Sequence, residues 1–158
     1  MNKKSLIVIA IMMLTCIGGV FAFGIGVQGG YNLGVPGNVA ITFKLDSVPI
    51  IFAGNFYIAD DLFAVGLTGD YWMLNENISG PFNWFTGAGV GTTISIPNEG
   101  KMGFLLAARV PVGINAYFAD NFVEPYIQLV PMLDLSFLPS IALRFDLDLN
   151  LGVRFWFD

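Results

Sequence analysis

Residues 141–157 read IALRFDLDLNLGVRFWF, and apolar side chains occupy every second position of this stretch. The positions between them carry four charged residues, Arg144, Asp146, Asp148 and Arg154. Because successive side chains of a β-strand point to opposite faces, one face is apolar enough for lipid and the other is polar. This alternation is typical of a strand in a transmembrane β-barrel, where apolar side chains face lipid and polar ones face the lumen.

The same alternation recurs along the rest of the chain, in segments bounded by residues typical of turns. It predicts strands at 23–31, 38–44, 50–58, 62–74, 82–94, 102–118, 123–134 and 141–157, with a polar loop at 75–81. These segments predict an all-β fold, an eight-stranded antiparallel up-and-down transmembrane β-barrel. Pro111, Pro125 and Pro131 fall inside the strands, and we expect β-bulges there because proline lacks a backbone donor.

The composition supports a membrane barrel. Hydrophobic residues make up 55% of the 158 residues and charged residues only 12%, against about 25% charged residues in ordinary soluble domains. No apolar run long enough for a membrane helix follows the first 22 residues. Only helices and closed barrels satisfy the backbone hydrogen bonds in lipid, so this combination favours a barrel.

The first 22 residues have the features of a secretory signal peptide. Lys3 and Lys4 precede an apolar core at 6–14, and we expect cleavage near Ala22, leaving residues 23–158 as the outer-membrane β-barrel. An uncleaved membrane anchor is the alternative. The only cysteine, Cys16, lies in this segment and poorly fits a lipidation site, so the mature chain has no disulfide. The net charge of −5 argues against nucleic acid as a partner.

The last strand also contains a recognisable signal. Residues 150–157 fit the pattern polar-x-Gly-x-x-apolar-x-apolar, with Asn150, Gly152, Phe155 and Phe157 at its defined positions. This pattern resembles the β-signal that outer-membrane barrels present to the barrel assembly machinery. Such chains usually end on the final aromatic residue, whereas Asp158 follows here.

Several short pieces resemble small eight-stranded outer-membrane β-barrel proteins of spirochaetes and other Gram-negative bacteria. They are FGIGV from Phe23, TGDYW from Thr68, FTGAGVG from Phe85, ARVPVGINAYF from Ala108, EPYIQLVP from Glu124 and LGVRFWF from Leu151. The resemblance implies the barrel and the outer membrane as its location. It implies no ligand and no reaction.

Charged residues of both signs fall on the inward face of the predicted strands. They are Lys44, Asp70, Arg109, Glu124, Asp134, Arg144, Asp146, Asp148 and Arg154. An eight-stranded barrel is just wide enough for side chains to fill it, and buried charges need partners. We therefore expect a charge network that plugs the lumen, with Arg109, Arg144 and Arg154 facing Glu124, Asp146 and Asp148. A narrow polar path is the alternative.

The aromatic residues near the strand ends divide by the same alternation. Tyr31, Tyr71 and Trp84 fall on the outward face, where aromatic girdles mark the membrane interfaces. Trp72 and Trp156 fall on the inward face and are expected to pack in the lumen.

Catalysis has little support in the sequence. The chain has no histidine, so Ser-His and metal-histidine arrangements are excluded. Residues 24–29 match G-x-G-x-x-G, but a dinucleotide site requires a helix after this string and none is predicted. Metal binding by Asp134, Asp146 and Asp148 is a minor alternative. We expect no enzyme, no cofactor and no metal.

These observations predict a small integral outer-membrane protein, structural in role, with a filled polar lumen. Its expected partners are outer-membrane lipid and the barrel assembly machinery. A narrow channel for small solutes is the first alternative. Adhesion through the loops and a soluble periplasmic lipid-binding barrel are the others, and the lipid carrier would need an apolar interior, the reverse of residues 141–157.

Overall fold

The computed structural model describes residues 22–32, 35–59 and 62–157. Within them lie nine strands: β1 (Phe23–Asn32), β2 (Val35–Leu45), β3 (Val48–Ala59), β4 (Leu62–Ser79), β5 (Phe82–Pro97), β6 (Gly103–Arg109), β7 (Val112–Ala116), β8 (Val123–Leu138) and β9 (Ala142–Phe157). Apart from Ala22, the predicted signal peptide falls outside the described residues. No helix in the described ranges is long and apolar enough to span a membrane.

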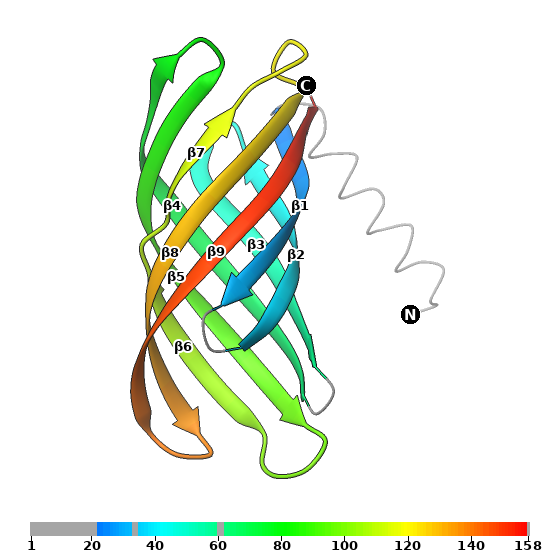
Figure 1. Cartoon of the computed structure of the whole chain (residues 1–158), viewed down its shortest axis with the longest axis vertical. Helices are drawn as coiled ribbons and strands as arrows, with labels where there is room; N and C mark the ends of the chain where they lie inside the picture. Colours follow the sequence, from blue (N-terminus) through cyan, green and yellow to red (C-terminus); the bar gives the residue numbers. More distant parts are fainter. Residues whose placement is uncertain (1–21, 33–34, 60–61, 158) are drawn as a thin grey trace, which may run out of the picture.

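The strands form a closed antiparallel ring (Figure 1). Apart from β6 and β7, consecutive strands pair with each other, and β9 pairs with β1 from Phe23↔Phe157 to Asn32↔Asp148, which closes the sheet. Strands β6 and β7 are two halves of one crossing, because both pair with β5 on one side and β8 on the other. The described strands therefore make eight crossings, and the predicted eight-stranded antiparallel barrel is confirmed.

The three prolines behave differently from the prediction. Pro111 lies in the break between β6 and β7, where the Val110 amide donates to the Pro131 carbonyl over 3.0 Å. The predicted bulges at Pro125 and Pro131 are wrong, because β8 keeps one continuous register against β9. Pro131 lies opposite the break between β6 and β7, and Pro125 lies just beyond the last β7–β8 pair. Neither missing donor interrupts the pairing with β9.

The predicted loop at 75–81 is also wrong. Residues 75–79 continue β4, and only Gly80 and Pro81 connect it to β5. The Asn77 amide donates to the carbonyls of Gly80 and Phe82 over 2.9 and 3.1 Å, which stabilises the turn. In Figure 1 this green hairpin extends beyond the neighbouring strands, and residues 73–79 are exposed on both faces. The polar composition reflects a two-sided exposed hairpin rather than a loop.

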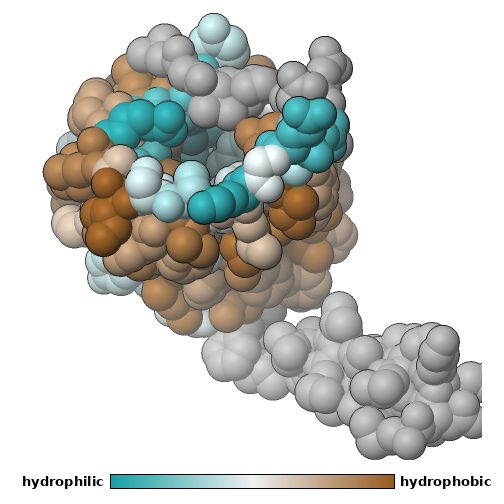
Figure 2. Space-filling model, turned by 90° about the horizontal axis from the view of Figure 1, so that it is seen from below, coloured by the Kyte–Doolittle hydropathy of each residue, from teal (hydrophilic) through white to brown (hydrophobic). Residues whose placement is uncertain are grey.

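The alternation separates two environments. Among the described residues, the buried polar and charged side chains point into the barrel and include Gln28, Thr42, Lys44, Asn115 and Glu124. Large apolar side chains such as Val39, Leu67, Val90 and Leu151 are exposed on the outside. Figure 2 shows hydrophobic residues covering the flanks of the barrel around a hydrophilic end. This arrangement is the inverse of a soluble lipid carrier, which needs an apolar interior.

Close strand packing inside the barrel generates the first testable prediction. Gly87 faces the lumen, and an added Cβ would collide with the carbonyl oxygen of Tyr71 on β4. We expect Gly87→Ala to lower the unfolding free energy by about 1–3 kcal/mol, because the backbone must move to accommodate the methyl group. Urea unfolding of the refolded protein in detergent measures the loss.

Gly54 provides the matched control. A Cβ added there meets no atom within 4 Å. Gly54→Ala should therefore leave the stability unchanged or slightly raised. An equal loss of stability in both variants would show that the constraint is not the lumen contact.

Candidate functional site: the barrel lumen

The lumen holds an ion pair that is completely buried. Arg154 on β9 lies directly opposite Glu124 on β8, and its Nη1 donates to Glu124 Oε2 over 2.6 Å. Both side chains are 0% exposed. The indole Nε1 of Trp156 donates to the same oxygen over 2.8 Å, and the Asn115 amide donates to Glu124 Oε1 over 2.9 Å. The Tyr117 hydroxyl donates to Glu124 Oε1 over 3.4 Å, so the carboxylate has one charged partner and three neutral donors.

Aromatic rings fill the space around this pair. Trp72 and Phe85 stack with ring centroids 3.7 Å apart. The ammonium group of Lys44 lies 4.5 Å from the centroid of the Trp72 ring, and the Arg154 guanidinium lies 5.0 Å from that of Tyr126. Both cations are placed for cation–π attraction, which is stronger where water is excluded.

A second ion pair links β4 to β6. Arg109 Nε and Nη2 donate to the two carboxylate oxygens of Asp70 over 3.0 and 3.2 Å, a bidentate arrangement with both residues buried. The two residues lie on strands that are not adjacent, with Gly89 of β5 in register between them. Because Gly89 has no side chain, the Arg109 and Asp70 side chains meet across β5.

A third group lies toward the barrel end opposite Ala22 and Phe157. Arg144 Nη2 lies 2.9 Å from Asp146 Oδ2 and 3.6 Å from Asp134 Oδ2. The Arg144 side chain is 56% exposed, whereas both aspartates are buried. Asp148 lies opposite Asn32, whose amide donates to it over 2.6 Å.

The structure places all nine predicted lumen charges inside the barrel or at its mouth, and Arg144 alone among them is exposed. It brings together Arg154 with Glu124 and Arg144 with Asp146. Arg109 pairs with Asp70 instead of one of the three carboxylates expected to face it, because Gly89 leaves the path to Asp70 open.

Sequence reasoning did not identify the neutral residues that complete the network. Asn115 and Asn32 donate to Glu124 and Asp148, and the Tyr126 hydroxyl donates to Gln28 over 3.0 Å. Gln28, Asn32, Asn115 and Tyr126 all face the lumen and are buried. Strand alternation therefore could have predicted their inward orientation. Their lack of charge made them less conspicuous than their partners.

The aromatic residues predicted to face outward differ in their exposure. Tyr31 and Tyr71 are 62% and 48% exposed on the outer surface, and Trp84 is half-buried. The inward residues Trp72 and Trp156 pack in the lumen, Trp72 against Phe85 and Trp156 against Glu124.

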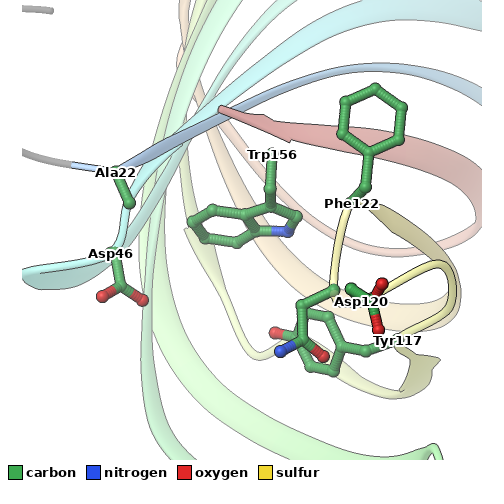
Figure 3. Close-up of a pocket in the computed structure, with 7 residues that line it drawn as sticks. Ala22, Asp46, Tyr117, Asp120, Phe122 and Trp156 are labelled. Carbon is green, nitrogen blue, oxygen red and sulfur yellow. The ribbon is translucent and has the colours of Figure 1, made fainter. Parts of the chain in front are cut away.

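The lumen has a large cavity toward each end and a much smaller one between them. At the end that contains Ala22 and Phe157, a cavity of about 450 Å³ lies beside Asp46, Tyr117, Asp120, Phe122 and Trp156. Figure 3 shows Asp46 and Asp120 on opposite sides of Trp156. Burial, with a further contribution from the Glu124 carboxylate, raises the pKa of the Tyr117 hydroxyl beside this cavity.

The middle of the lumen has almost no free space. The cavity bounded by Asp70, Trp72, Arg109, Tyr126 and Arg154 measures about 10 Å³, roughly the space of one water molecule. A second large cavity, of about 270 Å³, opens toward the other end. The two ion pairs and the aromatic stack therefore separate the two mouths.

Metal and dinucleotide sites receive no support from the geometry. In the described part of the chain, no three acidic, histidine or cysteine side chains are placed to hold a metal ion. The G-x-G-x-x-G string at residues 24–29 lies within β1, and the next described element is the antiparallel strand β2, not the helix that a dinucleotide site requires.

A closed eight-crossing barrel with an apolar exterior and charge pairs inside is the architecture of membrane β-barrels. The solved structures that share this fold include two outer-membrane barrels. The N-terminal β-barrel domain of OprF from Pseudomonas aeruginosa superposes with a TM-score of 0.62 at 15% identity, over 86% of this chain and 97% of that one. Neisserial surface protein A (NspA) gives a TM-score of 0.53 at 13% identity, over 87% and 97%.

The sequence comparisons find no relative. No protein-family model matches the chain. A search of curated proteins gives no match either. The structural likeness shows the fold that this chain shares with these outer-membrane barrels.

The buried central pair generates the second prediction. Arg154→Met leaves the Glu124 carboxylate in the same buried site without its cation. We expect the unfolding free energy to fall by about 3–5 kcal/mol, because an uncompensated buried charge is strongly destabilising. Urea unfolding of the refolded protein measures the change.

Two further variants test the physical cause. Arg154→Met combined with Glu124→Gln should recover most of the lost stability, because no charge is then left unpaired. Lys101→Met removes a positive charge from an exposed connection and should have little effect. Equal losses in the single and the double variant would contradict the unpaired-charge explanation.

Proposed function

We propose that this chain is a structural, non-enzymatic protein of the outer membrane whose lumen is closed by its own side chains. The observation that carries this proposal is the constriction of about 10 Å³ between the two mouths. Its lining includes Arg154, which pairs with Glu124, and the Arg109–Asp70 ion pair. Trp72, which stacks on Phe85, also lines it. Opening this layer would leave buried charges without partners.

The proposed location rests on the outer surface of the barrel. Exposed Ile, Val, Leu and Phe side chains surround it on all the described strands, and lipid is the solvent that favours such a surface. The predicted signal peptide, with cleavage near Ala22, supports export. Tyr31, Tyr71 and Trp84 on the outer face fit the aromatic girdles of such barrels. The resemblance of several short sequence pieces to small outer-membrane barrels of spirochaetes and other Gram-negative bacteria supports the same location.

The orientation follows from the two ends of the barrel. Ala22 and Phe157 lie at the same end, since β1 pairs with β9 in antiparallel register. If the chain enters from the periplasm, that end faces the periplasm and the end with the 270 Å³ cavity faces outward. The connections at the outward end are at most five residues long, between β5 and β6. They provide little surface for adhesion.

We also propose that the assembly machinery reads the last strand. Asn150 is buried on the lumen side of β9, whereas Phe155 and Phe157 are exposed on the outer face. Phe157 stacks on Phe23 with ring centroids 5.5 Å apart, beside the seam that closes the barrel. This edge is free for pairing until β1 and β9 meet.

A gel comparison tests the location and the assembly signal together. Protein from an outer-membrane fraction should migrate differently before and after boiling, because a closed barrel resists unfolding by detergent. Phe157→Asn should lose this shift in cells but keep it after refolding of the purified chain. Recovery of the unaltered protein in the soluble periplasm, without a shift, would overturn the proposed location.

The narrow channel remains a second candidate because cavities enter the lumen from both ends. Single-channel recording separates it from a closed lumen. We expect no current steps from the refolded protein across many insertions. Trp72→Ala should introduce small steps, since it removes a ring from the constriction, whereas Tyr71→Ala on the outer face should not.

Regular current steps from the unaltered protein would overturn the closed lumen and favour solute passage. Steps from Tyr71→Ala as large as those from Trp72→Ala would attribute the current to a loosened barrel.

A further inference from the structure

The cavity at the barrel end opposite Ala22 and Phe157 is a blind cup. Its volume is about 270 Å³, slightly below the range of about 300–1,000 Å³ of pockets for drug-sized ligands. Arg109 lies at its floor, bound to Asp70, and the constriction lies beyond. Figure 2 looks at this end of the barrel and shows hydrophilic residues around a central hollow. A small ligand can enter here without crossing the lumen.

One wall of the cup has more carboxylates than cations. Asp134 and Asp146 both line it and share the single guanidinium of Arg144. The Arg144 contact to Asp134 is long, 3.6 Å, and the other Asp134 oxygen, Oδ1, has no hydrogen-bond partner. Asp134 is only 5% exposed and is one of the residues that line the cup, so the cavity wall includes a buried carboxylate with one oxygen that lacks a partner.

The cation at the floor does not correct this imbalance. Both carboxylate oxygens of Asp70 already accept from Arg109. Asp148, next to the cup, has a neutral donor, the amide of Asn32. The cup therefore favours a ligand that brings a positive charge and hydrogen-bond donors. A buried polar atom that lacks a partner is costly, and such a ligand removes that cost.

The rest of the lining limits what the ligand can be. Leu62, Ala64, Leu105 and Met132 form apolar walls, while Tyr57, Thr93 and Ser95 add hydroxyl groups. Within the residues that the structure describes, no set of three carboxylates is arranged for a metal ion. An ammonium group needs only one carboxylate and a few neutral acceptors for its three donors.

We propose that this cup binds a small primary amine in its protonated form, with the ammonium group at Asp134 and a short apolar chain against Leu105 and Met132. The site is separate from the constriction that closes the lumen. It depends on the barrel fold and not on the proposed location, so the two proposals fail independently.

Three ligands of one chain length test the chemistry. Binding of n-butylamine, n-butanol and butyrate to the refolded protein would be measured by ligand-observed NMR at pH 7 in a zwitterionic detergent. We expect saturable binding of n-butylamine alone, because only it supplies an ammonium group. Equal binding of n-butanol, or no saturable binding of n-butylamine, would overturn the proposal.

Two isosteric variants test the place. Asp134→Asn should weaken n-butylamine binding about tenfold or more, as expected for the loss of a buried charged hydrogen bond. Asp46→Asn makes the same change of charge at the opposite end of the barrel and should leave binding unchanged. Heat-modifiability of both variants confirms that each is folded. Undiminished binding by folded Asp134→Asn would overturn the assignment of the ammonium group.

Discussion

Closure of the hydrogen-bond ladder between β1 and β9 is the constraint on which the rest of the structure depends. A sheet with free edges cannot exist in the hydrocarbon core of a bilayer, since each unpaired backbone group would cost several kcal/mol. The continuous register from Phe23↔Phe157 to Asn32↔Asp148 removes both edges at once. Once the ring is closed, each side chain along a strand points either to the outer surface or into the lumen.

The lumen of an eight-crossing barrel is narrow, and this explains how its charges are arranged. Glu124 and Arg154, Asp134 and Arg144, and Asn32 and Asp148 lie directly opposite each other on neighbouring strands. The register of the sheet therefore places these partners next to each other, whichever rotamers their side chains adopt. The pairs differ in burial, from the fully enclosed Arg154 to Arg144 at the mouth, which is about half exposed.

Much of this architecture could be predicted from strand alternation, because a period of two residues directly encodes the two faces of a strand. Alternation does not predict well where each strand ends and a loop begins. Residues 75–79 are polar because both faces of their hairpin are exposed, and composition alone does not distinguish this hairpin from a loop. Proline signals failed for a related reason: whether the missing donor of Pro131 matters depends on the neighbouring strand, which is interrupted there. The Arg109–Asp70 pair spans an intervening strand, so nearest-neighbour reasoning could not find it.

That pair has a consequence for how this barrel can vary. Gly89 forms no ion pair of its own, yet any side chain there would occupy the place of the Asp70 carboxylate. The ionic link between β4 and β6 is thus conditional on an empty position in β5. A side chain at Gly89 would displace the Asp70 carboxylate and leave Arg109 without its partner, so the ion pair depends on a position that carries no charge.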